Sequence, residues 1–294
     1  MKILVENKFG TGVVRRNPLI KIFQKILKIL NGQKIGKSAV PFDWNKGYDV
    51  HDTIGIIKIK NQGLNYSCGR QAGSYFQEIQ ERLRGVSEGE ISAKSGYGLY
   101  CSRGGGMTVT SIMTDIGAWG ANLEATVPSY DAYGNPLPEY LIEEQSWCTP
   151  QMIADANKRA GYTPFDISKD FETVAETVRD IGACIIEIRG NNNSTWLTAY
   201  PSINKVNDYW FHYLCVIGAK MINNKKYLIV LNSWGNIGDN GVQYFGEEWF
   251  TAGNVTDVFT FIYDAQLQPL PTNNSGWAEI ARYFRRIWGI AQTV

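Results

Sequence analysis

The feature that most constrains this chain is a set of polar residues that lie far apart in the sequence and suit one reaction once folding brings them together. Cys68 can supply a thiolate nucleophile, and His212, about 140 residues later, can take up its proton. Asn232 can fix the tautomer and ring plane of His212, and Gln62, shortly before Cys68, can donate to a developing oxyanion. The fold must therefore bring distant segments to one site.

Short motifs around these residues resemble the papain family of cysteine peptidases, over roughly residues 40 to 263. The motifs are VPFDW at 40–44, IKNQG at 59–63, and LNSWG at 231–235. The order of oxyanion glutamine, nucleophile, histidine and asparagine is also similar to that of the family. The resemblance implies an endopeptidase with Cys68, His212 and Asn232 as catalytic residues and Gln62 in the oxyanion hole.

Two further features of the resemblance concern substrate binding. In the family a pair of glycines lets the substrate backbone lie beside that of the enzyme, and Gly105 and Gly106 are the candidates here. Trp234 resembles the tryptophan that covers the Asn–His hydrogen bond and shields it from water. The resemblance implies an apolar preference in the pocket beside the glycines.

The residues after Cys68 depart from the family pattern of an aromatic followed by a small residue. Gly69 and Arg70 stand there, and Arg70 needs either an exit to solvent or a carboxylate partner. A second alignment puts Gln71 at the nucleophile position, and such a protein would be inactive. Cys68 is preferred because it keeps the family offset from Gln62. The other histidine, His51, precedes the nucleophile and so cannot be the family's base.

The hydrophobic pattern predicts an α+β fold with a helical half and a β half. Helical signals run from Cys68 through Arg84 and from Val109 to Trp119, and one more helix begins near Thr173. Strands are expected at 183–188, 213–217, 227–231 and 259–263. The resemblance implies a papain-like two-lobe fold, with a central nucleophile helix, an antiparallel β-barrel-like lobe and the active site in the interlobe cleft. The expected domains are a basic arm 1–39, a catalytic domain 40–265 with lobes at about 60–150 and 151–265, and a linker plus helix 266–294.

The two ends of the chain carry amphipathic patterns that the catalytic domain does not require. Residues 1–39 hold nine Lys and Arg and one Glu, and segment 17–30 has apolar residues at helical spacing. Segment 277–291 has an apolar stripe with two tryptophans after a Pro- and Asn-rich linker. Docking to a protein assembly or subunit through both segments is the favoured interpretation. A pro-segment, weak membrane-surface binding and a solvated helix are the alternatives for the arm.

Cysteine usage and the absence of a recognisable signal peptide favour a reducing cytoplasm, with packaging in a virion as a further hypothesis. The position of one family disulfide is taken by Asn65, whereas Cys101 and Cys148 fall where the resemblance offers another. Cys184 and Cys215 lie in apolar strands typical of reduced core residues. No run of eighteen apolar residues occurs, so no transmembrane span is expected.

No metal cluster, phosphate loop or dinucleotide motif is visible, so no cofactor and no metal are expected. The basic arm has few aromatic residues, and no nucleic-acid partner is expected. Two functions follow. The first is a thiol endopeptidase acting on a peptide or protein substrate. The alternative is a catalytically inactive papain-like module that serves a structural, binding or virion-assembly role.

Overall fold

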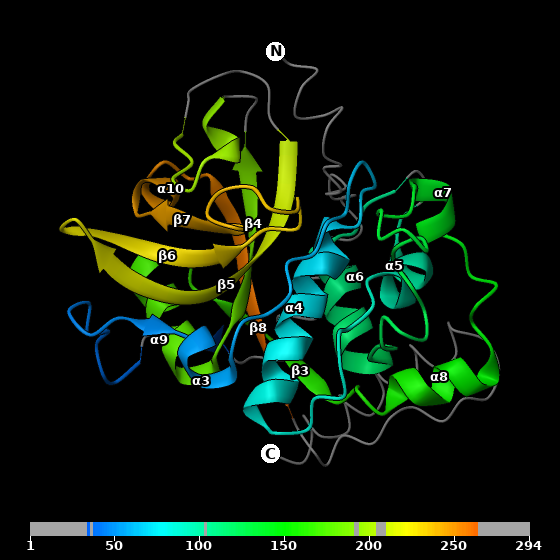
Figure 1. The fold of residues 1–294 in the computed structure, drawn as a ribbon. Coiled ribbons are helices and arrows are strands. Elements are labelled where there is room, and N and C mark those ends of the chain that lie inside the picture. Colours follow the sequence, from blue (N-terminus) through cyan, green and yellow to red (C-terminus); the bar gives the residue numbers. More distant parts are fainter. Residues whose placement is uncertain (1–33, 36–37, 103–104, 191–193, 204–209, 264–294) are drawn as a thin grey trace.

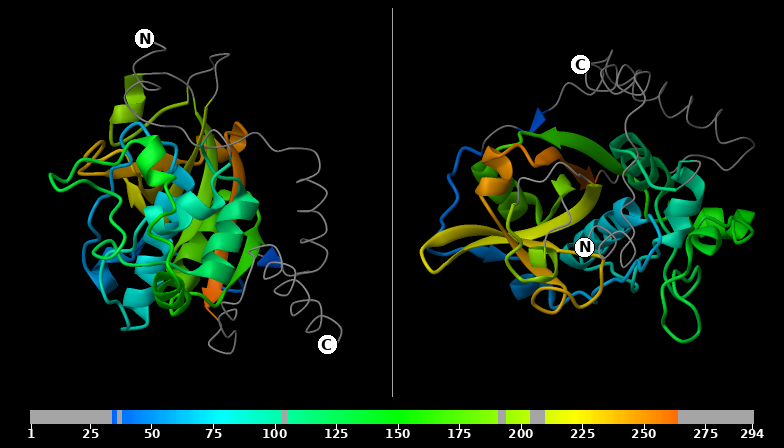
Figure 2. Two further views of the ribbon diagram at one scale, coloured as in Figure 1. Left: turned by 90° about the vertical axis from the view of Figure 1, so that its right-hand side faces the viewer. Right: turned by 90° about the horizontal axis from the view of Figure 1, so that it is seen from above.

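The computed structural model describes residues 34–35, 38–102, 105–190, 194–203 and 210–263. Both docking segments predicted from the sequence, 17–30 and 277–291, lie outside these residues. Two lobes stand side by side, with a twisted sheet on one side and a group of helices on the other, as Figure 1 shows. Figure 2 shows the same division from above. The α+β fold class expected from the sequence is therefore confirmed.

The helical lobe is built around one long helix. This helix, α4 (Cys68–Leu83), is buried along nearly its whole length and lies at the boundary with the sheet in Figure 1. The remaining helices of this lobe are α5 (Lys94–Tyr100), α6 (Val109–Thr114), the π-helix η1 (Asp115–Trp119), α7 (Glu139–Ile142) and α8 (Pro150–Asn157). The short helix α3 (His51–Ile54) precedes α4 and contacts it.

Within the described residues the β lobe is one sheet of eight strands, in which all neighbours but one are antiparallel. The strands are β1 (Lys34–Ile35), β2 (Tyr48–Asp49), β3 (Tyr162–Ile167), β4 (Cys184–Gly190), β5 (Trp210–Ile222), β6 (Lys225–Leu231), β7 (Val242–Gly246) and β8 (Val255–Tyr263). Their order is β1-β3-β8-β4-β5-β6-β7, and β2 pairs with β5. Helix α9 (Phe171–Ile181) packs on this sheet, and the short helices η2 (Ser194–Leu197) and α10 (Glu248–Thr251) lie in its connections.

Side chains alternate along β5 and so divide the core into two clusters. Leu214 and Val216 pack with the cluster that includes α9, whereas Tyr213 and Cys215 pack with the cluster that includes α4. Successive residues of a strand point to opposite faces, so β5 is covered on both sides. This burial explains why β4, β5, β6 and β8 have the apolar runs that made them predictable.

The part of the basic arm that the structure describes belongs to the sheet. Lys34 and Ile35 form β1, which pairs in parallel with Asp166 and Ile167 of β3. Just beyond, the Ser38 amide donates to Glu176 of α9 at 2.9 Å. These residues therefore lie against the β lobe.

Candidate active site

Cys68 is the first residue of α4, and its side chain is buried. Helix α4 packs against β5, the strand that carries His212. The amino end of a helix favours a negative charge through its dipole and its amide groups, so this position suits a thiolate. The alternative position, Gln71, lies one turn inside α4, where its Nε2 donates to Ser67 Oγ at 3.2 Å.

His212 and Asn232 meet because β5 and β6 are paired. The register places Cys215 opposite Leu231, so His212 near the start of β5 and Asn232 just after β6 lie at the same end of the hairpin. His212 Nε2 lies 2.9 Å from Asn232 Oδ1, and both side chains are buried. The strand pairing thus builds the predicted base and its orienting amide.

A residue that the sequence analysis did not single out fixes the direction of this amide. Gln243 of β7 accepts a hydrogen bond from Asn232 Nδ2 at 2.8 Å, and its own Nε2 donates to the carbonyls of Trp196 and Thr198 at 2.8 and 3.0 Å. Because Nδ2 is engaged by Gln243, the acceptor Oδ1 faces the imidazole. His212 Nε2 must then carry the proton, which leaves Nδ1 as the basic nitrogen. Nδ1 is buried and has no hydrogen-bond partner among the residues that the structure describes.

Aromatic rings enclose the imidazole. Trp234 lies over His212, with ring centroids 4.4 Å apart and ring planes inclined by 34°. The Trp210 ring is nearly perpendicular to the imidazole, with an interplanar angle of 85° and a centroid distance of 6.2 Å. Burial lowers the pKa of His212 to about 4, and the hydrogen bond with Asn232 opposes that shift. The ring is therefore neutral at neutral pH unless a nearby negative charge, such as a thiolate, stabilises its protonated form. Trp234 thus lies against the histidine whose hydrogen bond the resemblance expects it to cover.

Gln62 is joined to the same end of the sheet by backbone and side-chain contacts. Its amide N–H donates to the Ser233 carbonyl at 2.7 Å, and its Oε1 accepts from Ser233 Oγ at 2.6 Å. Its Nε2 donates to the Asn65 carbonyl at 2.7 Å. These contacts set the amide plane and turn Nε2 toward residues 63–67, the loop that leads to the predicted nucleophile Cys68 and is called the nucleophile loop below.

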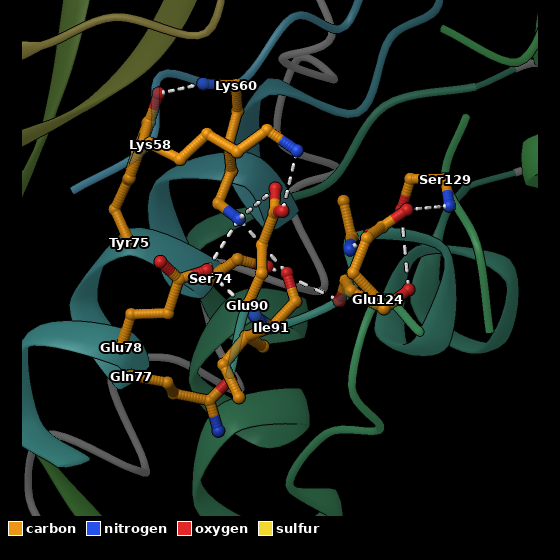
Figure 3. A network of polar contacts seen from close by, with 12 residues as sticks. Lys58, Lys60, Ser74, Tyr75, Gln77, Glu78, Glu90, Ile91, Glu124 and Ser129 are labelled. Atoms are coloured by element: carbon orange, nitrogen blue, oxygen red, sulfur yellow. Dashed lines mark hydrogen bonds and ion pairs between the residues drawn. The ribbon is translucent and has the colours of Figure 1, made fainter. Parts of the chain in front are cut away.

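The segment that carries Gln62 is anchored to α4 by a buried lysine, as Figure 3 shows. Lys60 Nζ donates to Glu78 Oε1 at 2.6 Å and to the Ile91 carbonyl at 3.1 Å. The Lys60 amide donates to Tyr75 Oη at 2.5 Å, and Tyr75 Oη in turn donates to the Asn232 carbonyl at 3.3 Å. Helix α4 therefore holds both the Gln62 segment and the end of β6.

Gly105 and Gly106 lie beside the loop that leads to Cys68. A Cβ atom on Gly105 would come within 2.6 Å of the Tyr66 ring, and both glycines have positive φ values of 91° and 80°. The Gly106 amide donates to Tyr97 Oη at 2.7 Å, and its carbonyl accepts from the Ser102 amide at 2.8 Å. A substrate carbonyl that paired with the Gly106 amide would have to displace Tyr97 Oη, whereas the Gly106 carbonyl can accept a second hydrogen bond.

The structure gives physical reasons for Gly69 and Arg70. A Cβ on Gly69 would approach Ile112 Cδ1 to 2.7 Å, so the Ile112 side chain of α6 occupies the space of a larger residue. Of the two possibilities that the sequence left for Arg70, an exit to solvent or a carboxylate partner, the structure shows the second. Arg70 Nε lies 3.1 Å from Oδ2 of Asp115 in η1, and both side chains are fully buried. Its Nη1 also donates to Gln77 at 2.8 Å.

The other polar candidates lie apart from this arrangement. His51 begins α3, where its Nδ1 lies 3.4 Å from Asp49. Cys101 and Cys148 are free thiols in this structure. Within the described residues no group of His, Cys, Asp and Glu could hold a metal ion, and no helix has the length and apolar character needed to cross a membrane.

No family model matches this sequence, and no curated protein matches it. Solved structures do match. Xylellain, a cysteine protease from Xylella fastidiosa, has a TM-score of 0.66 at 15% identity, over 88% of this chain and 97% of that one. The ragweed pollen allergen Amb a 11, a cysteine protease in its proform, matches with a TM-score of 0.61 at 17% identity, over 88% of this chain and 77% of the allergen. Digestive procathepsin L 3 of the Tenebrio molitor larval midgut matches with a TM-score of 0.57 at 17% identity, over 85% of this chain and 83% of the procathepsin. The chain thus has the papain-like cysteine protease fold.

Proposed function

We propose that this protein is a cysteine endopeptidase. The observation that carries the proposal is the oriented imidazole: His212 is held through Nε2 by Asn232, and its buried Nδ1 has no hydrogen-bond partner among the described residues. An oriented base of this kind can accept the proton of a thiol on the neighbouring helix end.

The proposed reaction proceeds by acyl transfer to sulfur. Cys68 Sγ attacks the carbonyl carbon of a peptide while His212 Nδ1 takes the thiol proton. The negative oxygen of the tetrahedral intermediate accepts from Gln62 Nε2 and from the Cys68 amide. His212 then gives its proton to the leaving amine as the C–N bond breaks, which leaves a thioester.

Hydrolysis of the thioester completes the cycle. Water attacks the thioester carbonyl while His212 takes up one of its protons, and that proton returns to sulfur as the carboxylic acid departs. Asn232 and Gln243 keep the ring in one tautomer through both half-reactions. Trp234 excludes water from the His212–Asn232 contact, where a low local dielectric strengthens the hydrogen bond.

The second candidate function is an inactive papain-like module used for binding. It is favoured by the full burial of Cys68 and His212 and by the internal hydrogen bonds of Gly106. In that case Cys68 would be one more buried thiol.

Labelling with an electrophilic epoxysuccinyl peptide separates the two functions. The expected result is stoichiometric modification of reduced wild type at neutral pH, mapped to Cys68 by mass spectrometry, together with release of product from a fluorogenic peptide. Burial raises the pKa of Cys101 to about 11 and also raises the pKa of Cys148, so background from these half-buried thiols should be low.

The control variants are Cys68→Ala, which should not label, and Cys101→Ser with Cys148→Ser, which should label like wild type. His212→Ala should label slowly and hydrolyse nothing measurable. Equal labelling of wild type and Cys68→Ala, with no hydrolysis by either, would overturn the peptidase proposal and leave the binding module.

A further inference from the structure

The loop between Gln62 and Cys68 contains a buried polar residue that the proposed mechanism does not use. Asn65 is 1% exposed, although its side chain carries both a donor and an acceptor. A buried amide is stable only when these groups are paired. The partners of Asn65 therefore indicate what this residue does.

Asn65 is bonded to both ends of its own loop. Its carbonyl accepts from Gln62 Nε2 at 2.7 Å. Its side-chain Oδ1 accepts from the Ser67 amide at 3.1 Å and from Ser67 Oγ at 2.6 Å. Ser67 immediately precedes Cys68, so one residue connects the oxyanion donor to the start of the nucleophile helix.

The same side chain ties the loop to a separate segment of the helical lobe. Asn65 Nδ2 donates to the Leu137 carbonyl at 2.8 Å. Next to it, the Tyr66 amide donates to Glu139 Oε2 at 2.6 Å, and Glu139 also accepts from Tyr97 Oη. Residues 137–139 thus hold the loop from outside at two consecutive positions.

The direction of the Asn65 amide is determined by its contacts. Oδ1 faces two donors of Ser67, and Nδ2 faces the Leu137 carbonyl. A flipped amide would place Nδ2 against the Ser67 donors and Oδ1 against the Leu137 carbonyl, where no hydrogen bond can form. The backbone of Asn65 is fixed in consequence, and its carbonyl fixes Gln62 Nε2. A shift of this loop would therefore displace Gln62 Nε2.

We infer that Asn65 is a positioning residue that sets Gln62 Nε2 relative to Cys68. The inference rests on the proposed function, because Gln62 acts there as the oxyanion donor. At a place where the resemblance leads one to expect a disulfide, the loop is held by the hydrogen bonds that Asn65 accepts from Ser67 and the one that it donates to Leu137.

The test is Asn65→Asp, which keeps the shape and the acceptor toward Ser67 but replaces the donor facing Leu137 with an acceptor. Losing an oxyanion donor lowers kcat by about a hundredfold to a thousandfold, so displacing it should lower kcat/KM for a fluorogenic peptide by roughly tenfold to a hundredfold. Alkylation of Cys68 by iodoacetamide forms no oxyanion, and its plateau rate in a pH profile should change by less than about threefold.

Two further measurements distinguish positioning from mere stability. When the carboxyl group introduced by Asn65→Asp is protonated, it regains a donor toward the Leu137 carbonyl, so the deficit in kcat/KM relative to wild type should shrink as the pH falls from 8 to about 5. In a Gln62→Ala background, Asn65→Asp should add less than about a threefold loss, because the group that it positions is gone. Asn224→Asp, on the exposed turn between β5 and β6, is the matched control and should behave like wild type.

Ser67→Ala is the second variant if Asn65→Asp does not fold. It removes the 2.6 Å contact to Oδ1 and should lower kcat/KM in the same direction, again without effect in the Gln62→Ala background. Losses that multiply in the double variants, or wild-type kcat/KM in active Asn65→Asp, would overturn the inference while leaving the peptidase proposal intact. Wild type that neither hydrolyses peptides nor labels at Cys68 would overturn both.

Discussion

At the scale of single residues, the site is a chain of amides that fix one another. Gln62, Asn232 and Trp234 could be proposed because they lie in short motifs, and His212 because of its order and its distance after Cys68. Gln243 could not, because it is an ordinary polar residue on a short strand whose importance depends on the register of β6 with β7. Its signal in the sequence was one polar position among apolar neighbours, which many exposed strands share.

Replacing Gln243 with Leu should lower kcat by about tenfold to a hundredfold with little change in KM, because Asn232 is then free to rotate and His212 loses its fixed tautomer. Steady-state kinetics on a fluorogenic peptide measure this. The effect should be much smaller in an Asn232→Ala background, where there is no amide left to orient. An unchanged kcat in Gln243→Leu would contradict the role given to this residue.

At the scale of elements, helix α4 shows most clearly what the structure adds to the sequence, because its buried Arg70 has a partner on another helix. The sequence left Arg70 either an exit to solvent or a carboxylate partner, and it could not identify the carboxylate because Asp115 lies on a separate π-helix. The structure adds that Gly96 of α5 packs against this pair, where a Cβ would overlap both Asp115 and Arg70. Small residues around the first turn of α4 thus make room for a buried ion pair.

Replacing Arg70 with Met should destabilise the fold by about 3–5 kcal/mol, because Asp115 is left buried without its cation. Burial already raises the pKa of Asp115 to about 7, and Arg70 opposes the rise, so the loss should grow as the pH increases through neutrality. Urea denaturation measures the free energy of unfolding. The double variant Arg70→Met, Asp115→Leu should recover most of the loss, and a single variant as stable as wild type would show that the pair contributes nothing.

At the scale of the whole molecule, the sequence predicted two lobes and the strands with long apolar runs. It did not predict β3, whose pattern is weakened by Pro164 and Asp166, or β7, which is five residues long and close to glycines. Both are defined by their neighbours: β3 pairs with β8, and β7 pairs with β6. Strands whose sequence signal is this weak are fixed by tertiary pairing.

The buried His212 should make global stability depend on pH in a Cys68→Ala protein, where no thiolate can pair with it. The folded pKa of about 4 lies below the unfolded value of 6.5, so the unfolded chain binds more protons between these limits. Stability should therefore fall as the pH is lowered from 6.5 to about 4, by about 3 kcal/mol from this group. Thermal or urea unfolding at several pH values measures the change. Cys68→Ala with His212→Gln should lack this component, and identical pH profiles for the two proteins would contradict the assignment.

All five cysteines are thiols in this structure, and the nucleophile loop is held by Asn65, Glu139 and the Lys60–Glu78 ion pair. Reducing agents do not break hydrogen bonds or ion pairs. A reductant strong enough to keep Cys68 as a thiol should therefore leave the fold intact. Mild oxidation should abolish activity while the protein stays folded. Oxidation is therefore expected to act on the Cys68 sulfur and to leave the fold around it unchanged.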